Sequence, residues 1–75
     1  MILPTKHIPQ NEALVGVGGT LLRHMDAPRT VSDLWDRVRH EENVGTFERF
    51  VLAADLLYLL GAIEVVEGLV VRVKT

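Results

Sequence analysis

The stretch TFERFVLAADLLYLLGAIEVVEGLVVRVKT, residues 46–75, decides the fold of this 75-residue chain. Thr46 is a favourable helix N-cap, and the apolar positions after it recur with helical spacing. The helix is expected to stop at Gly61, because glycine suits the left-handed backbone that ends many helices. Two runs rich in β-branched residues then flank Glu67-Gly68, a two-residue hairpin turn. The sequence therefore predicts a long helix followed by a β-hairpin.

The predicted long helix is apolar around most of its circumference. Its broader stripe, which we expect to face the core, comprises Phe47, Phe50, Val51, Ala54, Leu57 and Tyr58. The remaining, outward stripe comprises Glu48, Leu52, Asp55, Leu56 and Leu59. Leucines flanked by carboxylates suit the centre of a protein interface. This stripe is predicted either to bind a partner protein or a second copy, or to be covered by the first helix or the N-terminal arm of the same chain.

The predicted hairpin is expected to have one packed and one solvated face. Simple alternation assigns Ile63, Val65, Val71 and Val73 to the packed face, and Glu64, Arg72 and Lys74 to the solvated face. The hairpin should therefore close over the helices with one side only.

Helical spacing also occurs near the start of the chain. Asn11 is a favourable N-cap, and the apolar positions that follow it are Leu14, Val17, Leu21, Leu22 and Met25. Gly16, Gly18 and Gly19 interrupt this pattern and lower its helix propensity. Such glycines favour either close packing against another helix or ligand binding by a glycine-rich loop. Packing is the favoured interpretation, because no strand is predicted before them and no Gly-Lys-Ser or Gly-Lys-Thr follows.

A second amphipathic helix is predicted after a turn over residues 26–29. Thr30 lies three residues before Asp33, which is the spacing of a capping box. The apolar positions are Val31, Leu34, Trp35 and Val38, and the side chains expected to face solvent are Asp33, Asp36, Arg37 and Arg39. Residues 40–45 are predicted to form the loop that leads into the third helix.

Three helices closed by a hairpin is the element order of a winged helix-turn-helix. We therefore predict a mainly α fold with a C-terminal β-hairpin, formed by residues 11–75. Residues 1–10 contain two of the three prolines and are predicted to form an extended arm. In this arm Ile2 and Leu3 are expected either to complete the domain's own sheet or to reach into another subunit. The alternative architecture is a three-helix bundle whose hairpin adds to a partner's sheet.

Composition limits the classes of function. The apolar fraction of 48% is high for a chain too short to bury all of it. The chain has no cysteine, and its three histidines lack the spacing of a zinc site. We therefore expect neither catalysis nor a bound metal or cofactor. The first residues lack the apolar run of a signal peptide, so a cytoplasmic location is predicted.

DNA binding is the alternative function, since winged helices often bind DNA. The residues available for phosphate contact are Arg37, Arg39, Arg49, Arg72 and Lys74. The net charge of −2 gives no bulk attraction to phosphate. The two carboxylates on the outward stripe of the third helix would repel the DNA backbone where base-reading side chains are needed. The sequence therefore favours protein binding over an independent transcriptional regulator.

Three segments together resemble a known family. They are MILPTKH (residues 1–7), TVSDLW (residues 30–35) and FVLAADLLYLLGAI (residues 50–63). They are similar to the small middle components of bacterial ABC-three-component systems. This resemblance implies an accessory subunit encoded between an ABC-type ATPase, related to DNA-repair and chromosome-organising proteins, and a variable third component. It also implies a role in antiviral defence or in conflict between genomes.

Overall fold

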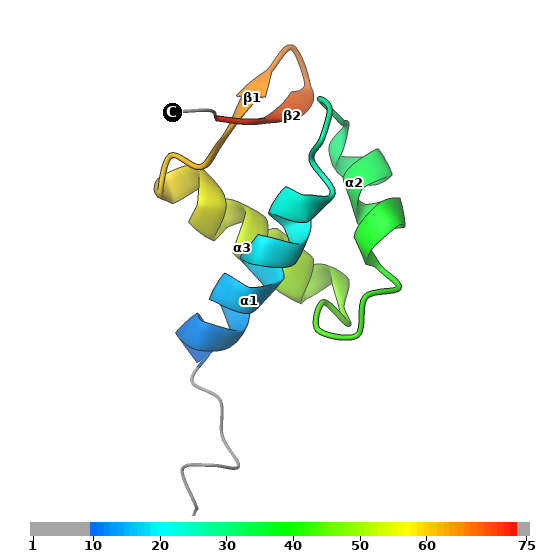
Figure 1. The fold of residues 1–75 in the computed structure, drawn as a ribbon, viewed down its shortest axis with the longest axis vertical. Coiled ribbons are helices and arrows are strands. Elements are labelled where there is room, and N and C mark those ends of the chain that lie inside the picture. Colours follow the sequence, from blue (N-terminus) through cyan, green and yellow to red (C-terminus); the bar gives the residue numbers. More distant parts are fainter. Residues whose placement is uncertain (1–9, 74–75) are drawn as a thin grey trace, which may run out of the picture.

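The computed structural model describes residues 10–73. Its elements in chain order are α1 (Gln10–Arg23), α2 (Val31–Val38), α3 (Phe47–Leu59), β1 (Ile63–Val66) and β2 (Leu69–Arg72). In Figure 1, α1 crosses α3, α2 lies to one side of this pair, and the hairpin rises from the end of α3 to the top of the view. The predicted mainly α, winged-helix-like fold is confirmed. The predicted arm, with Ile2 and Leu3, lies outside the described residues except for Gln10, which begins α1.

The core lies between α1 and α3 and is closed by α2 and the hairpin. Its buried apolar side chains are Val17, Leu21, Met25, Leu34, Val38, Val44, Phe50, Ala53, Leu57, Ile63 and Val70. At Gly18 the two long helices approach so closely that an added Cβ would stand 3.1 Å from Cδ2 of Leu57. Close helix packing was the favoured reason for the glycines, and it holds at Gly18. All three glycines lie inside α1, so their N–H groups bond along the helix rather than around a phosphate.

The start of α1 differs from the prediction. The helix begins at Gln10, so Asn11 is not its N-cap. Asparagine favours the cap position but also adopts helical backbone, and a single favourable side chain does not fix a helix end to the residue.

The buried face of α3 is rotated relative to the predicted core stripe. Phe47 and Tyr58, which the helical spacing assigned to the core, are 51% and 57% exposed, whereas Ala53 is fully buried. The buried line runs through Phe50, Ala53 and Leu57 because α1 offers Gly18 to that side, where small residues allow a close approach. The helix is apolar on several sides, so its sequence alone does not determine which side faces the core.

Local capping signals are confirmed for the second and third helices. The hydroxyl oxygens of Thr30 and Thr46 accept hydrogen bonds from the N–H groups of Asp33 and Arg49 at 3.1 and 3.2 Å. After α3, Gly61 has φ of 75° and the Ala62 N–H donates to the Leu57 carbonyl at 2.9 Å. This is a Schellman motif, which satisfies carbonyl groups at the helix end and turns the chain towards β1.

The loop between α2 and α3 is anchored to α1. Val44 is fully buried, although it lies in the predicted loop. The amide of Asn43 donates to the hydroxyl of buried Thr20 at 2.9 Å and to the Gly16 carbonyl at 3.3 Å. This connection fixes the start of α3 against α1.

Within residues 10–73 the sheet is a hairpin with one additional bridge. β1 and β2 are antiparallel, with Val66 opposite Leu69 and Ile63 opposite Arg72. Arg29, just before α2, forms an isolated bridge to Val70 on the outer edge of β2. In a winged helix, a short strand between the first two helices pairs with the last strand. Here that strand is represented by Arg29 alone.

This register corrects the predicted faces of the hairpin. The two-residue turn at Glu67-Gly68, where both residues have positive φ, sets Val65 opposite Val70. One face therefore carries Ile63, Val65, Val70 and Arg72, and the other carries Glu64, Val66, Leu69 and Val71. The predicted assignment of Val71 and Arg72 was wrong by one residue, which is enough to exchange the faces. Arg72 instead donates to the Leu22 carbonyl at 3.4 Å, at the C-terminal end of α1.

Arg29 also organises the charges at this junction. Its side chain is only 12% exposed and contacts Asp26 at 2.6 Å and Asp33 at 3.1 Å. The hydrogen bond from Arg29 lowers the pKa of Asp26, and a second hydrogen bond from Arg29 lowers the pKa of Asp33. The bond to Asp26 in turn raises the pKa of Arg29. The two aspartates therefore favour the folded state most when they are ionised.

Acidification is expected to destabilise the fold through Asp26 and Asp33. Because their folded pKa values are depressed, their stabilising effect is complete above about pH 4 and is lost as the pH falls through those values. Thermal unfolding followed by circular dichroism should give a Tm that falls in this acid range, and Arg29→Gln should make the fall shallower. Arg39→Gln, which removes an exposed arginine 3.9 Å from Asp36, is the control. If Tm fell equally steeply with pH in Arg29→Gln and wild type, Arg29 would not be the residue that stabilises the ionised forms of Asp26 and Asp33.

Two glycine substitutions should have opposite effects on stability. An added Cβ at Gly16 meets nothing within 4 Å, so Gly16→Ala should raise the free energy of unfolding by about 0.5–1 kcal/mol through lower chain entropy. Gly18→Val should lower it by about 1–3 kcal/mol, because the added atoms overlap Leu57. Urea unfolding measures both changes. A Gly18→Val variant as stable as wild type would exclude the close α1–α3 contact.

Candidate protein-binding surface

The predicted outward stripe of α3 lies at the surface. Glu48, Leu52 and Asp55 are exposed, and Leu59 is 80% exposed. Leu56 is half-buried, so it contributes less surface than predicted. Among residues 10–73 neither α1 nor another element covers this stripe completely. Its use by a partner stays a prediction.

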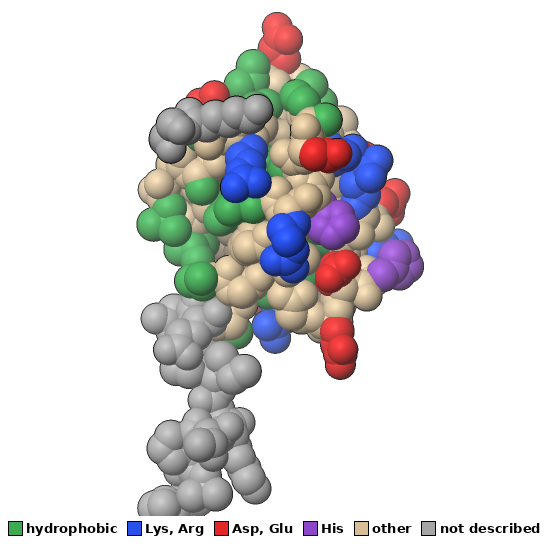
Figure 2. Space-filling view, viewed as in Figure 1, with side chains coloured by type: hydrophobic (Ala, Val, Ile, Leu, Met, Phe, Trp, Pro, Cys, Tyr) green, Lys and Arg blue, Asp and Glu red, His purple; other side chains and the backbone are tan. Residues whose placement is uncertain are grey.

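The apolar surface continues beyond the predicted stripe. Leu60 is 69% exposed at the end of α3, and Val65 and Val66 are exposed on β1. In Figure 2, hydrophobic side chains gather along the edge formed by the end of α3 and around the hairpin, while charged side chains gather over α2 and the loop after it. We call the exposed side chains of Leu59, Leu60, Val65 and Val66 the distal apolar surface, which includes both faces of the hairpin because Val65 and Val66 point to opposite sides.

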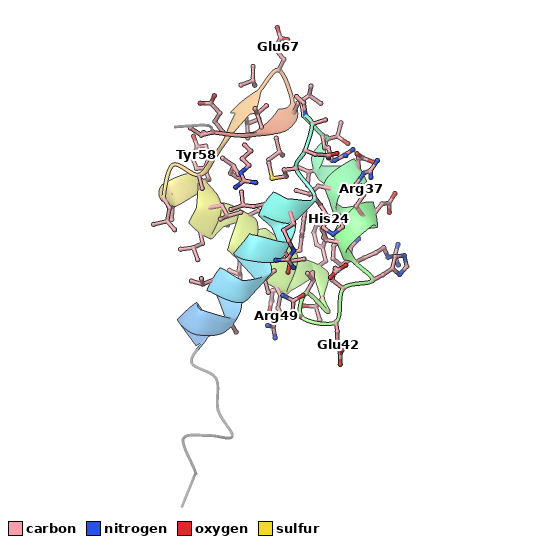
Figure 3. The ribbon with its side chains drawn as sticks, viewed as in Figure 1. His24, Arg37, Glu42, Arg49, Tyr58 and Glu67 are labelled. Carbon is pink, nitrogen blue, oxygen red and sulfur yellow. The ribbon has the colours of Figure 1, made fainter. Side chains whose placement is uncertain are left out.

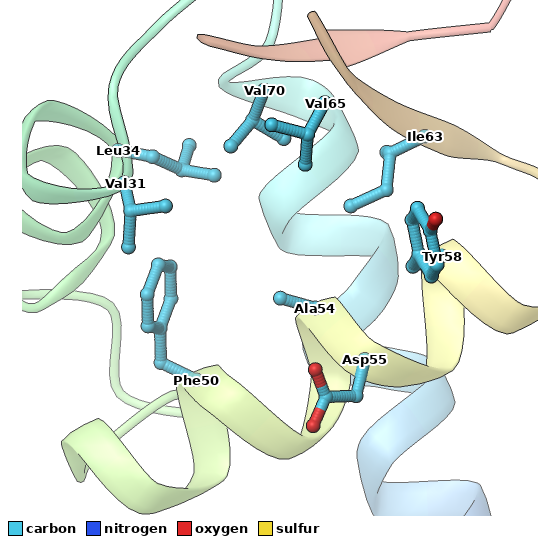
Figure 4. A pocket seen from close by; sticks show the side chains of 9 residues that line it. All are labelled: Val31, Leu34, Phe50, Ala54, Asp55, Tyr58, Ile63, Val65 and Val70. Atoms are coloured by element: carbon cyan, nitrogen blue, oxygen red, sulfur yellow. The ribbon is translucent and has the colours of Figure 1, made fainter. Parts of the chain in front are cut away.

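A groove opens beside this surface, between α2, α3 and the hairpin (Figure 4). Its volume is about 300 Å³. The lining residues are Val31, Leu34, Phe50, Ala54, Asp55, Tyr58, Ile63, Val65 and Val70. Leu34, Phe50, Ile63 and Val70 are buried core residues, whereas Val31, Tyr58 and Val65 are exposed at its rim. Asp55 contributes the one charged group of this lining. The groove is therefore an extension of the core that remains open to solvent.

Phe47 is exposed for a structural reason. Its ring lies 5.2 Å from that of Trp35 in an edge-to-face arrangement and 5.6 Å from that of Phe50. Such aromatic pairs are favourable without full burial. Phe47 therefore packs against α2 rather than into the core.

The predicted phosphate-contacting residues do not form one basic surface. Arg37 lies 3.3 Å from Asp33, and the guanidinium of Arg39 lies 5.8 Å from the centre of the Trp35 ring. In Figure 3, Arg37 and Arg49 lie at different ends of the molecule. The Nε atom of Arg49 is buried without a hydrogen-bond partner. Arg72 donates towards α1, as described above, and Lys74 lies outside the described residues.

Other site chemistry is sparse in the part of the chain that the structure describes. His24 lies 3.7 Å from Glu41, at the junction of α1 and the loop after α2. Residues 10–73 contain no group of three His, Cys, Asp or Glu side chains placed to hold a metal ion. No helix within the same range is long and apolar enough to cross a membrane.

Sequence reasoning missed the groove and the residues at its rim. Tyr58 was assigned to the core, and Val31 and Val65 were assigned to packed faces. The turn at Glu67-Gly68 carried a usable signal, because a two-residue loop fixes which residues of the two strands share a face. The rotation of α3, which exposes Tyr58, depends on the contact with α1 and had no local signal.

The comparisons with known proteins give one match. The model of the family described as ABC-three component (ABC-3C) system Middle Component 6 matches residues 3–74. Neither a curated protein nor a solved structure matches the chain. The matched range includes all three helices and the hairpin described above. The chain therefore belongs to the Middle Component 6 family of ABC-three component systems.

Proposed function

We propose that this chain is a non-catalytic accessory subunit that binds its system's other components through α3 and the distal apolar surface. The observation that carries the proposal is the exposure of Leu59 and Leu60 at the end of a helix that is otherwise the centre of the core. Burial of apolar area is the main favourable term in association. A partner that covers this end of α3 would bury the side chains that the domain leaves in water.

Charged neighbours give this contact its orientation. Glu48 and Asp55 lie on the same exposed side of α3 as Leu52 and Leu59. Carboxylates at the rim of an apolar patch select partners with basic groups around an apolar centre and disfavour others. The partner surface is thus expected to be apolar with a basic rim.

The resemblance to middle components supports a proposal for the identity of the partners. We infer that one partner is the ABC-type ATPase of the system and that the variable third component is another. The N-terminal arm, with Ile2 and Leu3, is proposed as a second contact. The process in which the complex acts is proposed to be antiviral defence or conflict between genomes within the bacterial cytoplasm.

Protein binding explains the described surface better than independent DNA binding does. A winged helix that reads DNA presents polar and basic side chains on its third helix, and here that side carries Glu48, Asp55 and leucines. The arginines that would contact phosphate come from different elements, and Arg37 and Arg72 engage groups of this chain. Contact with DNA is therefore assigned to the assembled complex and not to this chain alone.

Replacing Leu59 by glutamate should weaken binding to the ATPase. The change places a charge in the proposed interface, and co-purification of the ATPase with the tagged full-length chain should fall about tenfold or more. Because Leu59 is 80% exposed, the thermal unfolding curve should stay close to wild type. Glu42→Lys, in the loop at the far end of α3 from Tyr58 (Figure 3), is the control for a surface charge change. Full-strength co-purification of a folded Leu59→Glu chain would overturn the proposed interface.

The isolated chain should bind random duplex DNA only weakly. With few free cationic groups, its Kd should stay above about 100 µM at physiological salt, the upper end of the non-specific range. Fluorescence anisotropy with a labelled duplex at two salt concentrations measures this. Tight DNA binding that weakens steeply with salt would instead support a DNA-binding transcriptional regulator. In that case Arg37→Gln or Arg49→Gln should reduce the affinity.

A further inference from the structure

The free edge of β1 is a second feature that suits a protein partner. We propose that β1 pairs with an extended segment of another protein in which apolar and basic residues alternate. The proposal rests on the proposed function as a protein-binding subunit and names the element and the partner chemistry. The groove beside β1 would receive the apolar side chains of this segment.

The hairpin register fixes which backbone groups of β1 are free. Three hydrogen bonds establish the alternation: Val73 N–H donates to the Ala62 carbonyl at 2.9 Å, and Arg29 and Val70 exchange two bonds at 3.1 and 2.6 Å. Residues opposite each other in an antiparallel pair alternate between bonded and non-bonded pairs. Ala62–Val73 is bonded, so Ile63–Arg72 is not, and the alternation continues along the strands.

Ile63 and Val65 therefore point their N–H and C=O groups away from β2. The opposite edge of the sheet is already used, because Val70 bonds to Arg29. On the β1 side, no backbone bond to Ile63 or Val65 is formed by any segment within residues 10–73. A strand edge with unpaired groups is a template for an additional strand.

The groove is positioned for the side chains of such a strand. In an antiparallel pair, residues that exchange hydrogen bonds lie on the same face of the sheet. The added residues opposite Ile63 and Val65 would thus share the face that lines the groove, next to exposed Tyr58 (Figure 4). A cavity of about 150 Å³ already accommodates a benzene ring, so about 300 Å³ is room for a large apolar side chain.

The charges around the edge are acidic. Glu64 is the charged residue of β1, Glu67 lies in the turn, and Asp55 is the charged residue of the groove lining. A residue opposite Glu64 lies on the face away from the groove, where a lysine or arginine would form a cross-strand ion pair. The partner pattern is therefore apolar towards the groove and basic on the other face.

The same charges disfavour a second copy as the occupant. Pairing two β1 strands through Ile63 and Val65 sets Glu64 directly opposite its counterpart, and like charges in that position destabilise a sheet. A shift of two residues in either direction pairs Ile63 with Glu67 or Val65 with Gly61, and these partners have turn conformations with φ of 53° and 75°. Glu64 acts here as a charged residue that protects the edge from self-association.

The test uses the full-length chain and labelled six-residue peptides. The probe alternates valine and lysine, and a matched peptide alternates valine and glutamate. Two further versions of the valine–lysine peptide carry N-methyl groups on either the valines or the lysines. Methylated valines should weaken binding about tenfold or more because the N–H groups that face β1 are removed, whereas methylated lysines should bind as the parent does. Equal binding of both methylated peptides overturns the proposal.

Variants of the chain give the reciprocal result. Val65→Pro removes the outward N–H of Val65 while the hairpin bonds of Glu64 and Val66 remain, and should reduce peptide binding about tenfold. Val65→Thr keeps that N–H and is the matched control. Glu64→Lys should reverse the preference and favour the valine–glutamate peptide. Unchanged binding by a folded Val65→Pro chain, or an unchanged charge preference in Glu64→Lys, overturns the proposal.

Amide hydrogen exchange identifies any other occupant of the edge. In the free chain the amides of Ile63 and Val65 should exchange rapidly while those of Glu64 and Val66 are protected, and the valine–lysine peptide should protect the first pair. Protection of Ile63 and Val65 before peptide is added would overturn the proposal. Sedimentation equilibrium then distinguishes a dimer, in which a second copy covers the edge, from a monomer covered by its own N-terminal arm.

These readouts are independent of the test of the proposed function. If Leu59→Glu leaves ATPase co-purification unchanged, the proposed α3 interface is wrong, but the peptide-binding and hydrogen-exchange results still test the β1 edge. Peptide binding that ignores the backbone of Val65 removes the β1 edge but leaves the α3 interface intact.

Discussion

The junction made by Arg29 determines where the hairpin lies. Its backbone exchanges two hydrogen bonds with Val70, and its guanidinium bonds the His24 carbonyl, Asp26 and Asp33. The residue therefore joins the end of α1, the start of α2 and the strand β2. Because Val70 is buried in the core, fixing it also fixes the hairpin above α3. The groove between α2, α3 and β1 follows from this placement.

The same junction explains why the edge of β1 has no strand partner among residues 10–73. A two-stranded hairpin has two outer edges, and Arg29 occupies the one on β2. The remaining edge lies on β1, whose Val65 side chain lines the groove. The free backbone groups and the apolar groove are thus two results of one arrangement, and a partner strand at β1 would meet both together. This coupling makes the β1 edge a more selective docking element than an exposed strand alone.

Local signals in the sequence predicted the elements, while the orientation of their faces depended on tertiary contacts. Thr30, Thr46 and Gly61 were identified correctly because caps act within a few residues of themselves. On the core face of α3, Phe50 and Leu57 were assigned correctly, but Phe47 and Tyr58 were not. Apolar residues occur on several sides of this helix, and the contact with Gly18 of α1 decides which side is buried. The faces of β2 were misassigned because alternation was counted without the register that the turn imposes. Arg29 was not singled out, since its partners Val70 and His24 become neighbours only in the fold. Most of the outward stripe of α3 was placed correctly, and its role in binding stays a prediction.

Chain length and the composition of α3 together favour a subunit that depends on partners. A helix that is apolar around most of its circumference is normally covered by protein on most of its sides. Here α1 covers one side of α3, and α2 and the hairpin partly cover a second, but within residues 10–73 Leu59 and Leu60 remain 80% and 69% exposed. Replacing these leucines by basic residues would make the helix resemble a DNA reader and remove the apolar surface. The exposed leucines therefore favour a winged helix whose third helix completes its burial within a protein assembly.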